Sequence, residues 1–233
     1  MSSELTIRVN FSRPIPLFPL DGVVLLPQQV MPLHIFEERY RQMTRHVLDA
    51  HGQIAMAVVE NPASPGPTGP PLKRAVCIGQ IEQHEALPDG RFNILLRGVC
   101  RARIEAEDPL SDDRQFRQAY LEPIGLDTAP LPETESFREW LQDELSGGPL
   151  SRLAVAEQIR EFVVNDDVPT AALLELVSFA VTSDTQLRYR LLEEGDINER
   201  ARILRDGMQD LSDMIKQAMY QRPDDWPKGL SWN

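Results

Sequence analysis

The sequence predicts an α+β protein, in which a compact mixed sheet or barrel encloses one helix and is followed by a bundle of helices. From Ile15 to about Ile124 the apolar patterns are short, rich in β-branched residues and bounded by turn residues, as in strands. Residues 36–52 have helical spacing instead, and after GLDTAPLPETE apolar residues recur three or four apart. We therefore expect a β-domain at 1–126, a helical subdomain at 127–220 and a tail at 221–233.

The first half contains six strand-like stretches. Pro19, Pro27 and Pro32 interrupt the apolar run at its start, and proline is confined to strand edges, strand starts and bulges because it has no backbone donor. We therefore expect short extended pieces joined by sharp corners, and Gly98 reads as a bulge or corner. The six stretches are PIPLF, GVVLL, QIAMAVVE, AVCIGQIEQ, RFNILLRGVCRARIEA and QAYLEPI.

The single helix of this half is predicted from Phe36, Tyr40, Met43 and Val47, which recur at helical spacing with charged residues on the other face. Gly52 can adopt the left-handed conformation that ends such a helix. A helix enclosed by the strands is the economical interpretation.

A hairpin is predicted at Asp89-Gly90, because this pair favours a tight turn between two strand-like runs. It would bring Cys77 and Cys100 close on adjacent strands, where geometry permits a disulfide and a cytoplasmic setting argues against one. The proline- and glycine-rich residues 61–72 are expected to form a mobile surface loop.

The second half contains five helical stretches, two of which begin with the spacing of a capping box, Ser183 with Gln186 and Asp196 with Glu199. The last stretch is the longest and carries an apolar stripe that needs an apolar partner. Trp226 and Trp232 on the tail are expected to dock onto the domain or a neighbouring subunit. The stretches are SFREWLQDEL, LSRLAVAEQIREFVV, TAALLELVSFAV, SDTQLRYRLLEE and INERARILRDGMQDLSDMIKQAM.

Composition argues against several classes of partner. With 24 Lys and Arg against 36 Asp and Glu, the net charge of -12 repels nucleic acid and anionic membranes. The chain shows neither a signal-peptide pattern nor an apolar stretch long enough to cross a bilayer, so we expect a soluble, cytoplasmic protein. Two cysteines are too few for a zinc site with paired ligands.

Three blocks in order resemble the N-terminal domain of Lon proteases. PIPLFPLDGVVLLPQQVMPLHIFEERY resembles the start of that domain, ALPDGRFNILLRGVCRARIE its strand pair, and LLEEGDINERARILRDGM its helix junction. The resemblance spans about Ile15 to Met214 and implies a PUA-like β-domain wrapped round one helix, followed by a helical bundle. It also implies that the prolines mark corners where short strands pass around the barrel.

The ATPase and protease modules of Lon have no counterpart in these residues. The sequence has no GxxxxGK[ST] phosphate loop, and Lys73, Lys216 and Lys228 are its only lysines, none in a context like the catalytic Ser/Lys block. The chain therefore resembles a standalone Lon substrate-binding domain protein, related to the N-terminal part of cereblon. Two cysteines rule out the further zinc-bearing domain of a cereblon-type ligand pocket, and we expect no catalysis and no cofactor.

Candidates for chemistry are weak. His84-Glu85 lacks the second histidine of a zinc-protease motif. The other three histidines lie near one helix without a ligand-like spacing of cysteines or carboxylates, and helix-start stabilisation explains the acidic corner at the junction of the last two helices. These residues are His34, His46, His51, Glu193, Glu194 and Asp196.

The charged face of the first helix is the candidate protein-binding surface, weighed against an ordinary solvated face. Its residues are Glu37, Glu38, Arg41, Gln42 and Arg45. The resemblance implies a non-catalytic module that binds polypeptide segments or a protein partner, such as an adaptor in protein quality control, as a monomer or weak dimer. The alternatives are a small-molecule or nucleotide sensor, or an unrecognised enzyme, using the cleft between β-domain and bundle.

Overall fold

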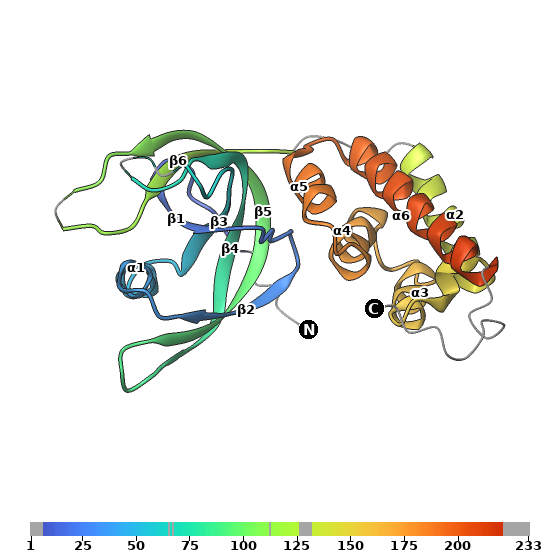
Figure 1. Cartoon of the computed structure of the whole chain (residues 1–233), viewed down its shortest axis with the longest axis horizontal. Helices are drawn as coiled ribbons and strands as arrows, with labels where there is room; N and C mark the ends of the chain where they lie inside the picture. The colour runs from blue at the N-terminus through green and yellow to red at the C-terminus, as the bar shows by residue number, and fades with distance from the viewer. Residues whose placement is uncertain (1–6, 65, 67, 112, 126–131, 221–233) are drawn as a thin grey trace, which may run out of the picture.

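The computed structural model describes residues 7–64, 66, 68–111, 113–125 and 132–220. Strands occupy the first half and helices the second, with one helix inserted among the strands (Figure 1). In chain order the elements are β1 Ile15–Leu20, β2 Val30–Ile35, α1 Glu38–Leu48, β3 Gln53–Val59, β4 Leu72–Ala86, β5 Phe92–Asp108, β6 Gln118–Pro123, α2 Pro132–Ser146, η1 Pro149–Arg152, α3 Ala156–Val163, α4 Thr170–Val181, α5 Thr185–Glu193 and α6 Ile197–Tyr220. The predicted α+β class is confirmed.

The sheet has the strand order β2-β5-β4-β3-β1-β6, and a further pairing of β5 with β6 closes five of these strands into a circuit. β5 serves two partners on the same side: its first part pairs with β2, up to Arg97, and its later part with β6, from Ala102 onward. Alanine and branched aliphatic side chains from all five strands of the circuit form one buried cluster, which includes Leu17, Ala57 and Val76. β1 and β3 run parallel, which a short hairpin cannot achieve, and the connection between them carries β2 and α1.

α1 belongs to the other buried cluster. Tyr40, Met43 and Val47 are buried and pack with Phe18 and Met56, which alternate along β1 and β3 with residues of the first cluster. The helix thus lies against the opposite face of the sheet and contacts both β1 and β2. In Figure 1 it lies beside the curved strands, at the end of the molecule remote from the bundle.

The predicted end of α1 is confirmed, whereas the predicted place of Phe36 in the buried stripe is wrong. Gly52 has φ +67° and its N–H donates to the Val47 carbonyl oxygen at 2.7 Å, which confirms the predicted stop. Phe36 precedes the helix and is 61 % exposed, so it is not part of the buried stripe.

Two of the three prolines lie within strands where no ladder partner needs their missing N–H, rather than at corners. Pro32 lies within β2, whose ladder connects it with β5 alone, and Pro19 lies within β1 beyond the two residues that pair with β6. Pro27 does lie in a turn, and it is followed by Gln28 with φ 67°. The GVVLL stretch is irregular backbone with three buried side chains rather than a strand, whereas β2 was not among the predicted strands.

The predicted hairpin joins β4 to β5. Gly90 has φ +80°, while Asp89 is not among the described residues with positive φ, so only one of the two needs the left-handed conformation. The predicted bulge is present, because Ile78 pairs with Cys100 and the next β4 residue pairs with Gly98. Cys77 and Cys100 are therefore neighbours, and both are free thiols.

The helical half follows the predicted stretches with two differences. The stretch from 150 to 164 is split into η1 and α3. Asp184 rather than Ser183 caps α5, accepting from the backbone N–H groups of Gln186 and Leu187. α6 is the longest helix described, with 24 residues. The expected boundary at 126/127 and the tail with Trp226 and Trp232 lie outside the described residues.

A buried charged cluster joins the two halves. The Arg101 guanidinium, on β5, donates two hydrogen bonds to the carboxylate of Glu175, on α4, at 2.7 and 2.8 Å. Arg200, on α6, lies 3.7 Å from the same carboxylate and donates to the carbonyl oxygens of Glu194 and Gly195. All three members are at most 9 % exposed.

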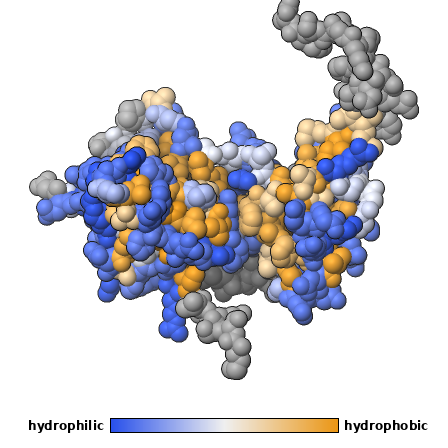
Figure 2. Space-filling view, turned by 90° about the horizontal axis from the view of Figure 1, so that it is seen from below, coloured by the Kyte–Doolittle hydropathy of each residue, from blue (hydrophilic) through white to orange (hydrophobic). Residues whose placement is uncertain are grey.

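The remaining surface is mixed. In the view from below, hydrophilic residues cover the outer end of the β-domain, and hydrophobic residues gather near the middle and on the helical half (Figure 2). Exposed large apolar side chains on described residues include Val30, Phe36 and Leu110. Among the described helices, none is long and apolar enough to cross a membrane.

Candidate functional site

The five predicted site residues lie in and next to α1. Glu38 is at the centre of their ionic contacts, 2.8 Å from a terminal nitrogen of Arg41 and 3.6 Å from one of Arg45. Glu37, at the N-cap position, pairs instead with Arg39 at 2.8 Å. Such exposed pairs contribute little to stability, so the Glu38–Arg45 contact can break at small energetic cost.

Arg41 and Gln42 have structural partners. Nε of Arg41 donates to the Gly90 carbonyl oxygen at 2.7 Å, which ties α1 to the β4–β5 turn. The amide of Gln42 donates to the Asp113 carbonyl oxygen and accepts from the backbone N–H of Gln115, both at 2.8 Å, which ties α1 to the β5–β6 loop. The face is therefore held between two loops, and these two residues are not simply solvated.

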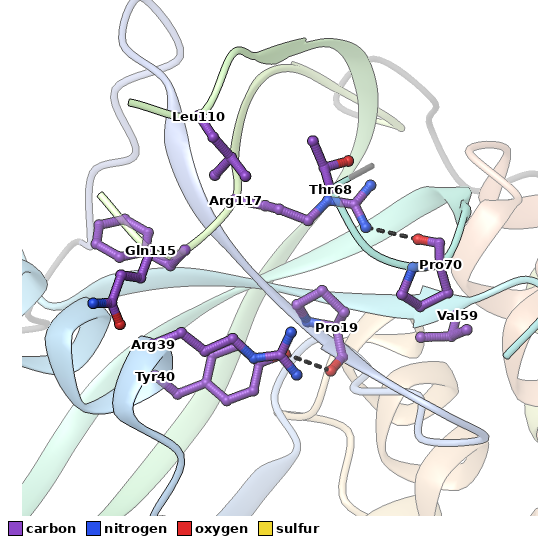
Figure 3. A pocket seen from close by; sticks show the side chains of 10 residues that line it. Pro19, Arg39, Tyr40, Val59, Thr68, Pro70, Leu110, Gln115 and Arg117 are labelled. Carbon is purple, nitrogen blue, oxygen red and sulfur yellow. Dashed lines mark hydrogen bonds between the residues drawn. The ribbon is translucent and has the colours of Figure 1, made fainter. Parts of the chain in front are cut away.

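A hollow of about 100 Å³ opens beside the N-terminal part of α1 (Figure 3). Its walls come from α1, from the ends of β1 and β3, and from the loops before β4 and β6, so segments distant in the sequence meet there. The lining residues are Pro19, Arg39, Tyr40, Val59, Thr68, Pro70, Leu110, Gln115, Phe116 and Arg117.

Fixed polar groups hold the walls of this hollow. The Tyr40 hydroxyl donates to the Pro19 carbonyl oxygen at 3.4 Å, and burial raises the pKa of this phenol. Arg117 donates to the Pro70 carbonyl oxygen at 2.7 Å and to both carboxylate oxygens of Glu107. Because Arg117 joins two loops and is itself paired, the hollow has a defined shape and no uncompensated charge from this guanidinium.

The size of the hollow limits what it can accept. Pockets for drug-sized ligands have volumes of about 300–1,000 Å³, and an apolar cavity of about 150 Å³ holds a molecule such as benzene. A volume of about 100 Å³ suits one small apolar side chain. Leu110 at its rim is 41 % exposed, so apolar surface is already available to an incoming side chain.

The other sequence candidates are not brought together. His34 contacts Asn93 and Arg91. The His46 ring packs against the ring of Phe116, with 5.5 Å between the two ring centres. Within the described ranges, no three His, Cys, Asp or Glu side chains are placed to hold a metal ion. His84-Glu85 lies on strand β4 rather than on a helix.

Asp196 caps the start of α6, but the predicted capping box is not closed, because Glu199 pairs with Arg202 instead of the backbone N–H of Asp196. Asp196 accepts from the backbone N–H of Asn198 at 2.8 Å, as expected at a helix start, and Glu194 accepts from the backbone N–H of Asp196 at 2.7 Å. Local hydrogen bonding accounts for these two carboxylates.

Sequence reasoning missed the hollow. The helical pattern places Tyr40 in the buried stripe, and its ring is buried. The pattern does not indicate that Tyr40 also lines the hollow, next to Pro19. No sequence pattern indicates that Arg117 and Thr68 line the same hollow, because they meet there only through the folding of two long loops.

The structure is that of an α+β domain, in which a charged helix face adjoins a hollow formed by distant segments. The family model described as "ATP-dependent protease La (LON) substrate-binding domain" matches residues 14–210, and the chain belongs to that family. The resemblance noted in three sequence blocks is thereby confirmed.

Two solved structures support the fold. The N-terminal domain of Mycobacterium avium complex Lon protease matches with a TM-score of 0.64 and 22 % identity, covering 85 % of this chain and 99 % of that one. The Lon N-terminal domain protein from Xanthomonas campestris matches with a TM-score of 0.56 and 22 % identity, covering 82 % and 96 %.

Curated relatives are much longer than this chain. Lon protease of Escherichia coli K12 is 25 % identical over 216 residues, which are 93 % of this chain and 26 % of that protein. Lon protease of Heliobacterium modesticaldum is 25 % identical over 204 residues, which are 88 % and 24 %. The chain thus spans about a quarter of the length of these relatives.

Proposed function

We propose that the chain is a non-catalytic module that binds polypeptide segments, and that the α1 face with its adjoining hollow receives them. The observation that carries the proposal is membership of a substrate-binding domain family over residues 14–210. The partner is an unfolded or otherwise exposed segment of another protein, and the module serves as an adaptor in protein quality control.

The geometry of the surface supports this proposal. An extended segment can insert one small apolar side chain into the hollow of about 100 Å³ while its polar groups meet Glu38 and Arg45. Because Arg41 and Gln42 tie the helix to two loops, the receiving surface is preorganised, which lowers the entropic cost of binding.

The enzymatic alternative has little support. The cleft between β-domain and bundle is lined by Glu60, Lys73, Arg74, Ala75, Arg103, Gln186, Tyr189, Arg190 and Glu193. This set contains no serine, threonine, cysteine or histidine, so it offers no nucleophile paired with an adjacent imidazole. The printed sequence also lacks the phosphate loop and Ser/Lys block, so we expect neither ATP hydrolysis nor proteolysis by the purified chain.

The test blocks the hollow with a bulky side chain placed at its rim. Thr68 is exposed and forms no side-chain hydrogen bond within the described structure, so Thr68→Trp should cover the hollow without disturbing the core. The ligand is fluorescently labelled ribonuclease A that has been reduced and carbamidomethylated to keep it unfolded, and native ribonuclease A controls for its charge. Fluorescence anisotropy should show that Thr68→Trp weakens binding about tenfold, equivalent to about 1.4 kcal/mol.

The matched control is Ser64→Trp, an exposed position on the same loop that does not line the hollow. It should bind as the parent protein does. Equal binding by parent and Thr68→Trp, with an unchanged melting temperature, would show that the hollow does not receive the polypeptide.

A further inference from the structure

A second surface lies where the β-domain meets the bundle. An open cleft of about 680 Å³ is bordered by the start of β4, by β5 and by α5. Four cationic side chains line it: Lys73 and Arg74 on β4, Arg103 on β5, and Arg190 on α5. The cleft shares no lining residue with the hollow beside α1.

These cations lack the partners that comparable residues have. Within the described structure, none of the four side chains forms an ion pair or donates a hydrogen bond, although Glu60 and Glu193 line the same cleft. Other arginines of the β-domain do pair with carboxylates, namely Arg91, Arg97, Arg114 and Arg117. Among the residues that line the cleft, four cations without an ion pair stand against two carboxylates, an excess of positive charge in a chain of net charge -12. Outside the lining, Glu122 is the β6 partner of Arg103 and Glu199 lies near Arg190, so Lys73 and Arg74 carry most of this excess.

The backbone holds this cleft in place. A register shift between β3 and β4 leaves residues 73–75 without β3 partners. The Ala75 N–H instead donates to the hydroxyl of Tyr189, on α5, at 3.0 Å, while Ala75 and Arg103 are cross-strand partners. The Lys73 ammonium lies 4.2 Å from the centre of the Tyr189 ring. Lys73, and Arg103 through its pairing with Ala75, are thus held beside a contact between the two halves.

The composition of the cleft favours one ligand chemistry. Guanidinium groups recognise carboxylates through paired hydrogen bonds, and spaced cations suit carboxylates spaced along a peptide. Glu60 and Glu193 repel every anion, but they repel a densely charged polyphosphate or nucleic-acid backbone more than a peptide whose carboxylates are spaced by neutral residues. Gln186 in addition offers an amide to a peptide backbone.

We propose that this cleft binds acidic polypeptide segments through their carboxylates, a proposal that rests on the proposed polypeptide-binding function. The cleft is then a second binding surface of the molecule, with acidic polypeptide segments as its ligands. An acidic stretch of a client would lie between Lys73 and Arg103 on the β-domain and Arg190 on α5, while other parts of the client reach the α1 face.

The test uses a fluorescein-labelled peptide of alternating Glu and Gly, with alternating Gln and Gly as its neutral counterpart. The full chain should bind the acidic peptide, more weakly as sodium chloride is added, and should not bind the neutral one. The double variant Lys73→Gln/Arg103→Gln should weaken binding about tenfold. The matched control Arg13→Gln/Arg152→Gln removes the same charge from exposed residues outside the cleft and should change binding less than about twofold.

Several results would overturn the proposal. These are no binding of the acidic peptide, equal binding of the neutral peptide, equal weakening by both double variants, or inorganic tripolyphosphate binding more tightly than the peptide and depending on Lys73 and Arg103. If circular dichroism shows that the cleft variant is unfolded, Arg190→Gln on the exposed face of α5 decides the matter, with about threefold weakening expected.

The two proposals fail separately. Thr68→Trp should leave binding of the acidic peptide unchanged, because Thr68 lines the hollow and not the cleft. If Thr68→Trp weakens the binding of unfolded ribonuclease A and leaves peptide binding unchanged, the result concerns the α1 surface alone. Peptide binding that is indifferent to Lys73 and Arg103 refutes the cleft alone.

Discussion

Removing the carboxylate of Glu175 should destabilise the protein strongly. This side chain accepts two charge-assisted hydrogen bonds from Arg101, at 2.7 and 2.8 Å, and lies 3.7 Å from Arg200. In Glu175→Ala both guanidinium groups stay buried without their carboxylate; burial already lowers the pKa of Arg200 to about 10, and the loss of Glu175, whose charge raises this pKa, lowers it further. Among the described residues, Nε of Arg200 already has no hydrogen-bond partner, so the cluster has little capacity to compensate.

The expected loss is about 3–5 kcal/mol, the usual effect of removing one partner from a buried ion pair. Two charge-assisted hydrogen bonds, at about 1.5–3 kcal/mol each, give a similar sum, which water entering the space left by the side chain reduces. Domains of this kind have unfolding free energies of about 5–15 kcal/mol, so the expected loss is a large fraction of the total stability. Urea unfolding followed by circular dichroism measures the difference.

Two controls separate charge burial from general damage. Glu157→Ala removes a carboxylate from the exposed Glu157–Arg160 pair and should have little effect. Replacing all three buried groups, as Arg101→Met/Glu175→Leu/Arg200→Met, should destabilise less than Glu175→Ala, because no buried charge is left without a partner. A Glu175→Ala loss below about 1 kcal/mol, or a larger loss in the triple variant, would refute the reasoning.

Two further predictions concern the β-domain. Burial raises the pKa of the Cys100 thiol from 9.0 to about 11, so labelling by Ellman's reagent should still rise about tenfold per pH unit between pH 9 and 10; a plateau near pH 9 would contradict this. Since the folded state keeps a proton that the unfolded state loses above pH 9, the stability due to this thiol falls as pH rises from 9 to about 11. Gly90→Val should lower stability by about 1–3 kcal/mol in urea unfolding, because φ is +80° and a Cβ would lie 2.2 Å from Arg41. Gly147→Val, where a Cβ meets nothing within 4 Å, should lose much less, and equal losses would contradict the turn argument.

Local patterns were enough to predict most elements. The apolar, β-branched run QIAMAVVE predicted β3, which is buried on both faces. Alternation in RFNILLRGVCRARIEA predicted β5 and the helical spacing after Phe36 predicted α1, because burial of one face imposes the period of the element. The Asp89-Gly90 turn was predictable for the same local reason, since a positive φ favours glycine. Three blocks of sequence were also sufficient to indicate the family.

The candidate site was predictable only in part. Exposed charges at Glu38 and Arg45 followed from the amphipathic pattern of α1. The partners of Arg41 and Gln42 did not, because Gly90 and Asp113 lie far along the chain and approach α1 only through loop folding.

Tertiary packing also separates residues that the pattern treats alike. Arg101 and Arg103 stand two apart on β5, and strand periodicity directs both to one face. Arg101 is 5 % exposed and paired with Glu175 of α4, while Arg103 is exposed in the cleft beside α5. Which arginine is buried depends on where the helical half docks, and that docking is decided by contacts between segments more than seventy residues apart, such as Arg101 with Glu175 at a separation of 74.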